Sequence, residues 1–154
     1  MSVEIEIVWG AGDGQTALGA FDAALSAAGI ENYNHVRLSS VIPADARIIE
    51  QGTHDQRWDV GSIVASVLSS RRSTVSGETI AAGLGWAIAE EGGIFFEETG
   101  ASTDTVDSLI KRGIESGKIH RSDWNWQDGV ATRICEHTVD DNGAVVVAAL
   151  FRPL

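Results

Sequence analysis

The chain has 154 residues, 44% hydrophobic and 21% charged, which suits one globular domain with a single core. Its 22 acidic residues outnumber 11 basic ones, and the formal net charge is −11. Nucleic-acid backbones and anionic membranes both bind clusters of basic side chains, and the bases here are scattered. We therefore expect neither a nucleic acid nor a membrane as partner.

The cysteine content and the N-terminus point to a reducing compartment. Cys135 is the one cysteine, which excludes an internal disulfide framework. The first residues show no basic region followed by an apolar run, as a signal peptide would. No apolar stretch reaches membrane-spanning length, so we expect a cytoplasmic protein.

Alternation and helical spacing divide the first part of the chain into elements. Apolar residues alternate with acids over Val3–Trp9, which predicts a strand, and Gly10–Gly14 reads as a flexible turn. Apolar residues recur at spacings of three and four over Leu18–Ala28, which predicts a helix ended by Gly29. Tyr33–Leu38 is expected to be a second strand.

The middle of the chain is harder to interpret. Between Ala44 and Val75 the pattern supports only one strand, around Ser62–Leu68. Thr79–Glu90 and Gly93–Glu98 read as two strands joined by a turn. Ala101–Lys118 is predicted to be a helix, with a capping residue at its start and one apolar stripe.

Two apolar strands close the chain. They cover Ala131–Val139 and Ala144–Phe151, and the Asn-Gly pair in the turn Asp140–Gly143 predicts that they form a hairpin. The order of strands and helices favours a layered α+β domain over a doubly wound parallel sheet.

Three familiar chemistries fit poorly. Gln15 follows Gly10–Gly14, so the dinucleotide fingerprint is broken, and no Gly-Lys-Ser/Thr of a P-loop follows either. Cys135 and His137, with His120 or His54, have no second pair at metal-ligand spacing. A buried cysteine beside a hydrogen-bonded histidine explains that pair more simply. No Gly-x-Ser-x-Gly elbow supports a nucleophilic serine.

An acidic pair beside two aromatic residues is a better candidate. Phe95 and Phe96 precede Glu97 and Glu98, and an apolar setting raises the pKa of a carboxyl group. Such a group can act as a proton donor near neutral pH. Strand alternation would send one of the two acids to solvent, and the residue types leave open which one.

Several short blocks, taken in order, resemble the pyruvoyl-dependent arginine decarboxylases over nearly the whole chain. The region Ala44–Val75 is the part without a clear match. The blocks are Gln15–Leu25, Ala28–Ile30, Asn34–Pro43, Gly77–Ile80, Gly93–Glu97 and Glu136–Val139.

The resemblance implies self-cleavage between Ser39 and Ser40. In that family the hydroxyl of the second serine attacks the preceding carbonyl, and elimination and hydrolysis then leave a pyruvoyl group. Here the products would be residues 1–39 (β chain) and 40–154 (α chain), with the cofactor derived from Ser40. Asn34 matches the asparagine that assists this step, and neither a metal nor pyridoxal phosphate is expected. The second pair, Ser69-Ser70, lacks the surrounding motif.

The resemblance also implies the reaction. The pyruvoyl group would condense with the α-amine of L-arginine, release CO₂ and yield agmatine for polyamine biosynthesis. Glu97 matches the glutamate that returns a proton to the α-carbon. Asp22 matches the acid that binds the guanidinium, and Leu18 and Leu25 would line the aliphatic stem.

The family further implies a fold and an assembly. We expect residues 1–154 to form a single domain, a four-layer αββα sandwich, assembled as a homotrimer or a dimer of trimers with sites between subunits. Two alternatives stay open. One is a pyruvoyl decarboxylase of another amino acid, and the other is an unprocessed, non-catalytic homologue that acts as a partner subunit.

Overall fold

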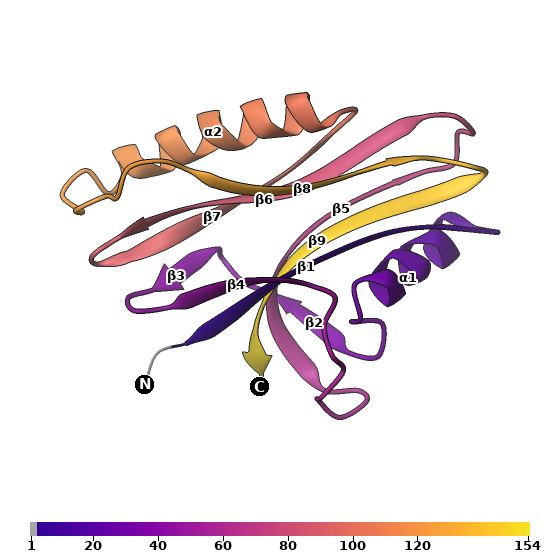
Figure 1. Ribbon diagram of the computed structural model, residues 1–154, viewed down its shortest axis with the longest axis horizontal. Coiled ribbons are helices and arrows are strands. Elements are labelled where there is room, and N and C mark those ends of the chain that lie inside the picture. The colour runs from indigo at the N-terminus through magenta and orange to yellow at the C-terminus, as the bar shows by residue number, and fades with distance from the viewer. Residues whose placement is uncertain (1–2) are drawn as a thin grey trace.

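The computed structural model describes residues 3–154, which form two helices and two β-sheets in an α+β arrangement (Figure 1). One sheet has five strands in the order β2-β5-β9-β1-β4, and the other has four in the order β3-β7-β6-β8. The elements in chain order are β1 (Glu4–Gly14), α1 (Ala17–Ala27), β2 (Asn34–Arg37), β3 (Val41–Pro43), β4 (Arg47–Gly52), β5 (Ile63–Ser73), β6 (Thr79–Ala89), β7 (Gly92–Gly100), α2 (Thr103–Ile119), β8 (Ala131–Thr138) and β9 (Asn142–Pro153).

The sheets pack face to face, and each helix covers an outer face (Figure 1). Between the sheets, β1, β5 and β9 meet β6 and β7 through fully apolar side chains. Helix α1 lies on the five-stranded sheet and α2 on the four-stranded sheet. The side chains that make these contacts include Ile7, Val147, Leu84 and Phe95 between the sheets, Ala20 and Ala24 on the buried face of α1, and Val106, Ile110 and Ile114 on the buried face of α2.

The prediction of a turn at Gly10–Gly14 is wrong, because these residues continue β1. Helix α1 crosses β1 so closely that side chains do not fit between them. A Cβ atom at Gly12 would lie 2.6 Å from the Cβ of Ala23, and one at Gly10 would lie 2.5 Å from the carbonyl oxygen of Ala24. Glycine is therefore needed here for helix–strand contact and not for a turn.

The predicted C-terminal hairpin is also wrong. β8 pairs with β6 in the four-stranded sheet, whereas β9 lies between β5 and β1 in the five-stranded sheet. The segment Asp140–Gly143 thus passes the chain from one sheet to the other. Asp13 on β1 holds this crossing, because its carboxylate accepts hydrogen bonds from the backbone N–H of Asp140 (3.0 Å) and from His137 (2.9 Å).

The poorly patterned region between residues 44 and 75 contains two strands. β4 is a short edge strand that runs parallel to β1, and β5 extends to Ser73, beyond the predicted end. The helix predicted over Ala101–Lys118 is confirmed as α2, with Ser102 as its N-cap. Neither helix within residues 3–154 combines the length and the apolar run that a bilayer crossing requires.

Candidate active site

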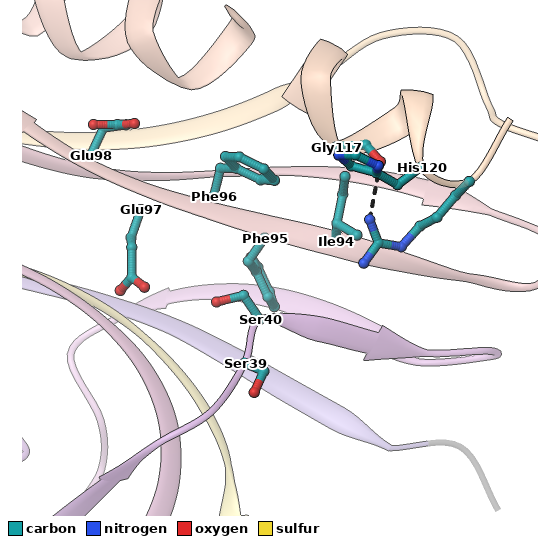
Figure 2. Close-up of a pocket in the computed structure, with 10 residues that line it drawn as sticks. Ser39, Ser40, Ile94, Phe95, Phe96, Glu97, Glu98, Gly117 and His120 are labelled. Atoms are coloured by element: carbon teal, nitrogen blue, oxygen red, sulfur yellow. Dashed lines mark hydrogen bonds between the residues drawn. The ribbon is translucent and has the colours of Figure 1, made fainter. Parts of the chain in front are cut away.

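The Ser39–Ser40 bond lies where the chain passes between the two sheets (Figure 2). On one side, the backbone N–H of Leu38 donates to the carbonyl of Ser66 on β5 at 3.0 Å. On the other side, the carbonyl of Ser40 accepts from the backbone N–H of Phe95 on β7 at 2.8 Å. A backbone hydrogen bond to each sheet therefore fixes the chain on both sides of the Ser39–Ser40 bond.

Ser40 has a strained backbone. Its φ is +70°, in the left-handed region that disfavours residues with a Cβ atom. Such a conformation costs on the order of 1–3 kcal/mol and persists only where the surroundings impose it. Here the hydrogen bond from Phe95 and the pairing of β3 with β7 impose it.

A pocket of about 440 Å³ opens beside this serine pair. β7 supplies an apolar wall from Ile94, Phe95 and Phe96, followed by two acids. The end of α2 closes the far side with Gly117, His120 and Arg121.

Glu97 and Glu98 point to opposite sides of β7 (Figure 2). Phe95 and Glu97 are two residues apart on β7 and so share the face that looks toward Ser40. Figure 2 shows Glu97 pointing to the segment that carries Ser40, whereas Glu98 points to the α2 side. Of the two acids, Glu97 is therefore the one on the Ser40 side of β7 (Figure 2).

Glu97 has the electrostatic character of a proton donor. Although its side chain is accessible to solvent, desolvation by its surroundings raises the pKa of its carboxyl group. The positive charge of Arg37 works against this rise, and the negative charge of Glu98 adds to it. A raised pKa retains the proton at higher pH, which suits proton return to a carbon.

Two groups near the pocket were not expected from the sequence. Arg121 is fixed, because its guanidinium donates to the carbonyl of Gly117 at 3.0 Å and lies 5.7 Å from the Trp124 ring centre. His120 is the residue that ends α2. Both follow the helix in a polar stretch, and no pattern there signals a site.

The structure does not bring Asn34 to Ser40 within one chain. Asn34 starts β2, and its side-chain amide donates to the carbonyl of Gly61 at 3.0 Å. Six residues of nearly extended chain, roughly 20 Å, separate it from Ser40.

Asp22, Leu18 and Leu25 also lie away from Ser40 within the chain. They sit with Thr16 and Phe21 around a hollow of about 520 Å³ on the outer side of α1, beyond the five-stranded sheet. Leu18 is 66% exposed, because the buried face of α1 is its alanine face. The apolar stripe that the spacing predicts is therefore only partly the core face.

The other serine pair has a different setting. Ser69 and Ser70 lie in regular β5, and neither has a positive φ. The Ser69 hydroxyl is buried, donates to the carbonyl of Glu98 at 2.8 Å and accepts from the N–H of Gly83 at 3.2 Å. The Ser69 hydroxyl therefore links β5 to the other sheet, and neither residue has the positive φ of Ser40.

The metal alternative gains no support from the described residues. Within residues 3–154, no three His, Cys, Asp or Glu side chains are arranged to hold an ion. Cys135 is partly buried against the core, and His137 pairs with Asp13.

Comparison with known proteins adds an independent observation. The family model described as "Pyruvoyl-dependent arginine decarboxylase (PvlArgDC)" matches residues 4–153. A Halobacterium salinarum protein named pyruvoyl-dependent arginine decarboxylase is 37% identical, over 94% of this chain and 92% of its own length. Proteins of the same name from Thermococcus sibiricus (36%, covering 90% and 87%) and Pyrococcus furiosus (34%, covering 91% and 88%) are also similar.

These matches span both sheets, both helices and the strained serine pair. The chain belongs to the pyruvoyl-dependent arginine decarboxylase family.

Proposed function

We propose that this chain decarboxylates L-arginine to agmatine and CO₂, using a pyruvoyl group that it makes from Ser40. The observation that carries this proposal is the left-handed backbone of Ser40, φ +70°, at a serine pair that lines a pocket with Glu97. Family membership supplies the reaction, and the geometry supports the residue assignments.

The setting of Ser40 suits self-cleavage. Its hydroxyl would attack the carbonyl carbon of Ser39, and the anchors on both sides restrict the rotations that would carry the two groups apart. After the acyl shift, loss of the Ser40 Cα proton breaks the Cβ–Oγ bond and leaves Oγ in the new Ser39 carboxylate. Hydrolysis of the resulting dehydroalanine releases ammonia and gives the pyruvoyl group.

The residues around Ser40 fit that group. A pyruvoyl group supplies an electron sink for the pair left when CO₂ departs. The Ser40 carbonyl would flank its ketone, and that carbonyl already accepts a hydrogen bond from Phe95 N–H. Ile94 and Phe95 form an apolar wall that favours loss of charge from a carboxylate, and Glu97 holds the proton that returns to the α-carbon.

Recognition of the guanidinium needs a carboxylate, since a planar fork binds one in a bidentate manner. Asp22, Leu18 and Leu25 line an exposed hollow on α1 that is both acidic and apolar. This hollow does not include Ser40 of the same chain. We propose that it completes the pocket of a neighbouring copy in a homotrimer of four-layer αββα subunits. Asn34, at the far end of β2, would assist cleavage at the same subunit boundary.

Intact-mass measurement under denaturing conditions tests the cofactor. We expect two chains, residues 1–39 and 40–154, with the larger blocked to amino-terminal sequencing. Ser40→Ala should remain whole, and the matched variant Ser70→Ala should cut normally. A whole wild-type chain would instead support the unprocessed partner subunit, and a cut at Ser69–Ser70 would refute the choice of serine pair.

The substrate needs its own experiment. Processed protein should release CO₂ and agmatine from arginine, and Asp22→Asn should raise the KM for arginine more than it lowers kcat. An unchanged KM would remove Asp22 from the site. Activity on another amino acid but not on arginine would favour the second alternative.

A further inference from the structure

Arg37 stands beside the proposed site but has no part in the reaction described above. It is the last residue of β2, and its side chain lines a hollow of about 190 Å³ together with Glu97, Glu98 and Ser70. Glu97 and Glu98 line the larger pocket at Ser40 as well. Arg37 and the proposed proton donor Glu97 therefore border the same hollow.

The charges around Glu97 make Arg37 distinctive. Glu98 adds a negative charge from the same strand, and His120 and Arg121 face the pocket from the end of α2. Of these, Arg37 is the group whose positive charge opposes the retention of a proton on Glu97. Arg37 forms no ion pair within 4.0 Å among residues 3–154, so its guanidinium is not committed to another carboxylate.

Cleavage at Ser39 would change this balance. It creates a carboxylate on Ser39, two residues beyond Arg37, and a terminal carboxyl group is ionised at neutral pH. The position of Arg37 is fixed, because β2 pairs with β5 and Leu38 bonds to Ser66. Two residues span at most about 7 Å, so the new carboxylate stays within reach of an arginine side chain.

Resting on the proposed function, we propose that Arg37 is a positioning residue that couples maturation to catalysis. Before cleavage its charge opposes the protonation of Glu97, and after cleavage it pairs with the new Ser39 carboxylate and opposes that protonation less. Glu97 thus holds its proton more strongly in a chain that has already made its cofactor.

The test follows the titration of Glu97 directly. In protein labelled with ¹³C at glutamate side chains, the Glu97 signal is the one lost in Glu97→Gln. We expect its titration midpoint to be higher in the cut wild type than in uncut Ser40→Ala. Arg37→Met should raise the midpoint in the Ser40→Ala background and change it little in the cut protein.

Two controls separate this role from a general effect. Arg37→Lys keeps the charge and should leave the Glu97 midpoint of the uncut chain unchanged. Arg47→Met removes the same charge from the exposed edge strand β4 and should leave the midpoint where it was. If Arg37→Met folds poorly, the comparison of Ser40→Ala with cut wild type and the Arg37→Lys variant still decide the question.

The outcomes are distinct from those of the proposed function. A wild type that remains whole overturns the proposed function and the coupling together. A cut wild type in which the midpoint equals that of Ser40→Ala overturns the coupling alone. So does an Arg37→Met variant that shifts the midpoint equally in cut and uncut chains.

Discussion

The strain at Ser40 can be measured as a difference between two uncleavable variants. With φ at +70°, alanine at this position keeps the Cβ clash, whereas glycine removes it. The left-handed conformation costs alanine about 1–2 kcal/mol. Glycine loses about 0.5–1 kcal/mol through the greater freedom of its unfolded chain. Ser40→Gly should therefore be more stable than Ser40→Ala by about 0.75 kcal/mol, the difference between the midpoints of these two ranges.

The neighbouring residue provides the control. Ser39 is not among the residues with positive φ, so glycine there should be less stable than alanine by about 0.5–1 kcal/mol. The Ser39→Gly and Ser39→Ala variants are made in the Ser40→Ala background, so that all four proteins stay uncut. The sign of the glycine–alanine difference should reverse between adjacent residues.

Urea unfolding at one protomer concentration measures both differences. With an m-value of about 2 kcal/mol/M, each difference moves the midpoint by about 0.3–0.5 M. Equal or greater stability of Ser40→Ala over Ser40→Gly would show that the backbone of Ser40 is not strained. That result would refute the proposal that backbone strain at Ser40 contributes to cleavage.

Three further predictions concern pH and packing. Burial raises the pKa of Glu97, so ionisation of this group opposes folding. Relative to its parent, Glu97→Gln in the uncut Ser40→Ala background should therefore gain stability as pH rises above 4.5, measured by urea unfolding across pH. Hydrogen bonds from the N–H of Asp140 and then from His137 lower the pKa of Asp13, so the stability that ionised Asp13 contributes is present at neutral pH and lost as pH falls below 3.8. Asp13→Asn should therefore be less stable than wild type at pH 7, and the difference in free energy of unfolding should shrink in acid. Gly12→Ala places a Cβ atom 2.6 Å from Ala23 and should cost about 1–3 kcal/mol by the same assay, and an unchanged midpoint would contradict the close contact of α1 with β1.

Local pattern was enough to predict much of the fold. Both helices follow from apolar residues spaced three and four apart, and the paired strands β6 and β7 follow from apolar runs on either side of a turn. Pattern failed where a contact distant in sequence decides the structure. Gly10–Gly14 is a strand because it pairs with the start of β9, and the Asn-Gly turn joins two sheets because β9 pairs with β1 and β5 instead of β8.

The candidate site shows the same division. Motif resemblance points to Ser39, Ser40 and Glu97, and all three line one pocket, together with Glu98. The choice between Glu97 and Glu98 needed the direction of β7 relative to Ser40, which residue types do not contain. Arg37 shares a hollow with Glu97 because β2 pairs with β5, which packs against β7, and no local signal marks it.

The position of the serine pair reconciles self-cleavage with a stable fold. A cut between Ser39 and Ser40 leaves β2 bonded to β5 on one side and β3 bonded to β7 on the other. No strand hydrogen bond has to break, and the φ constraint at Ser40 disappears with its Cα stereocentre. Cleavage would thus remove strain of roughly 1–3 kcal/mol without removing core contacts. A cut at Ser69–Ser70 would instead divide β5, which pairs with β9 along ten residues from Val64 to Ser73, and would expose the centre of the five-stranded sheet.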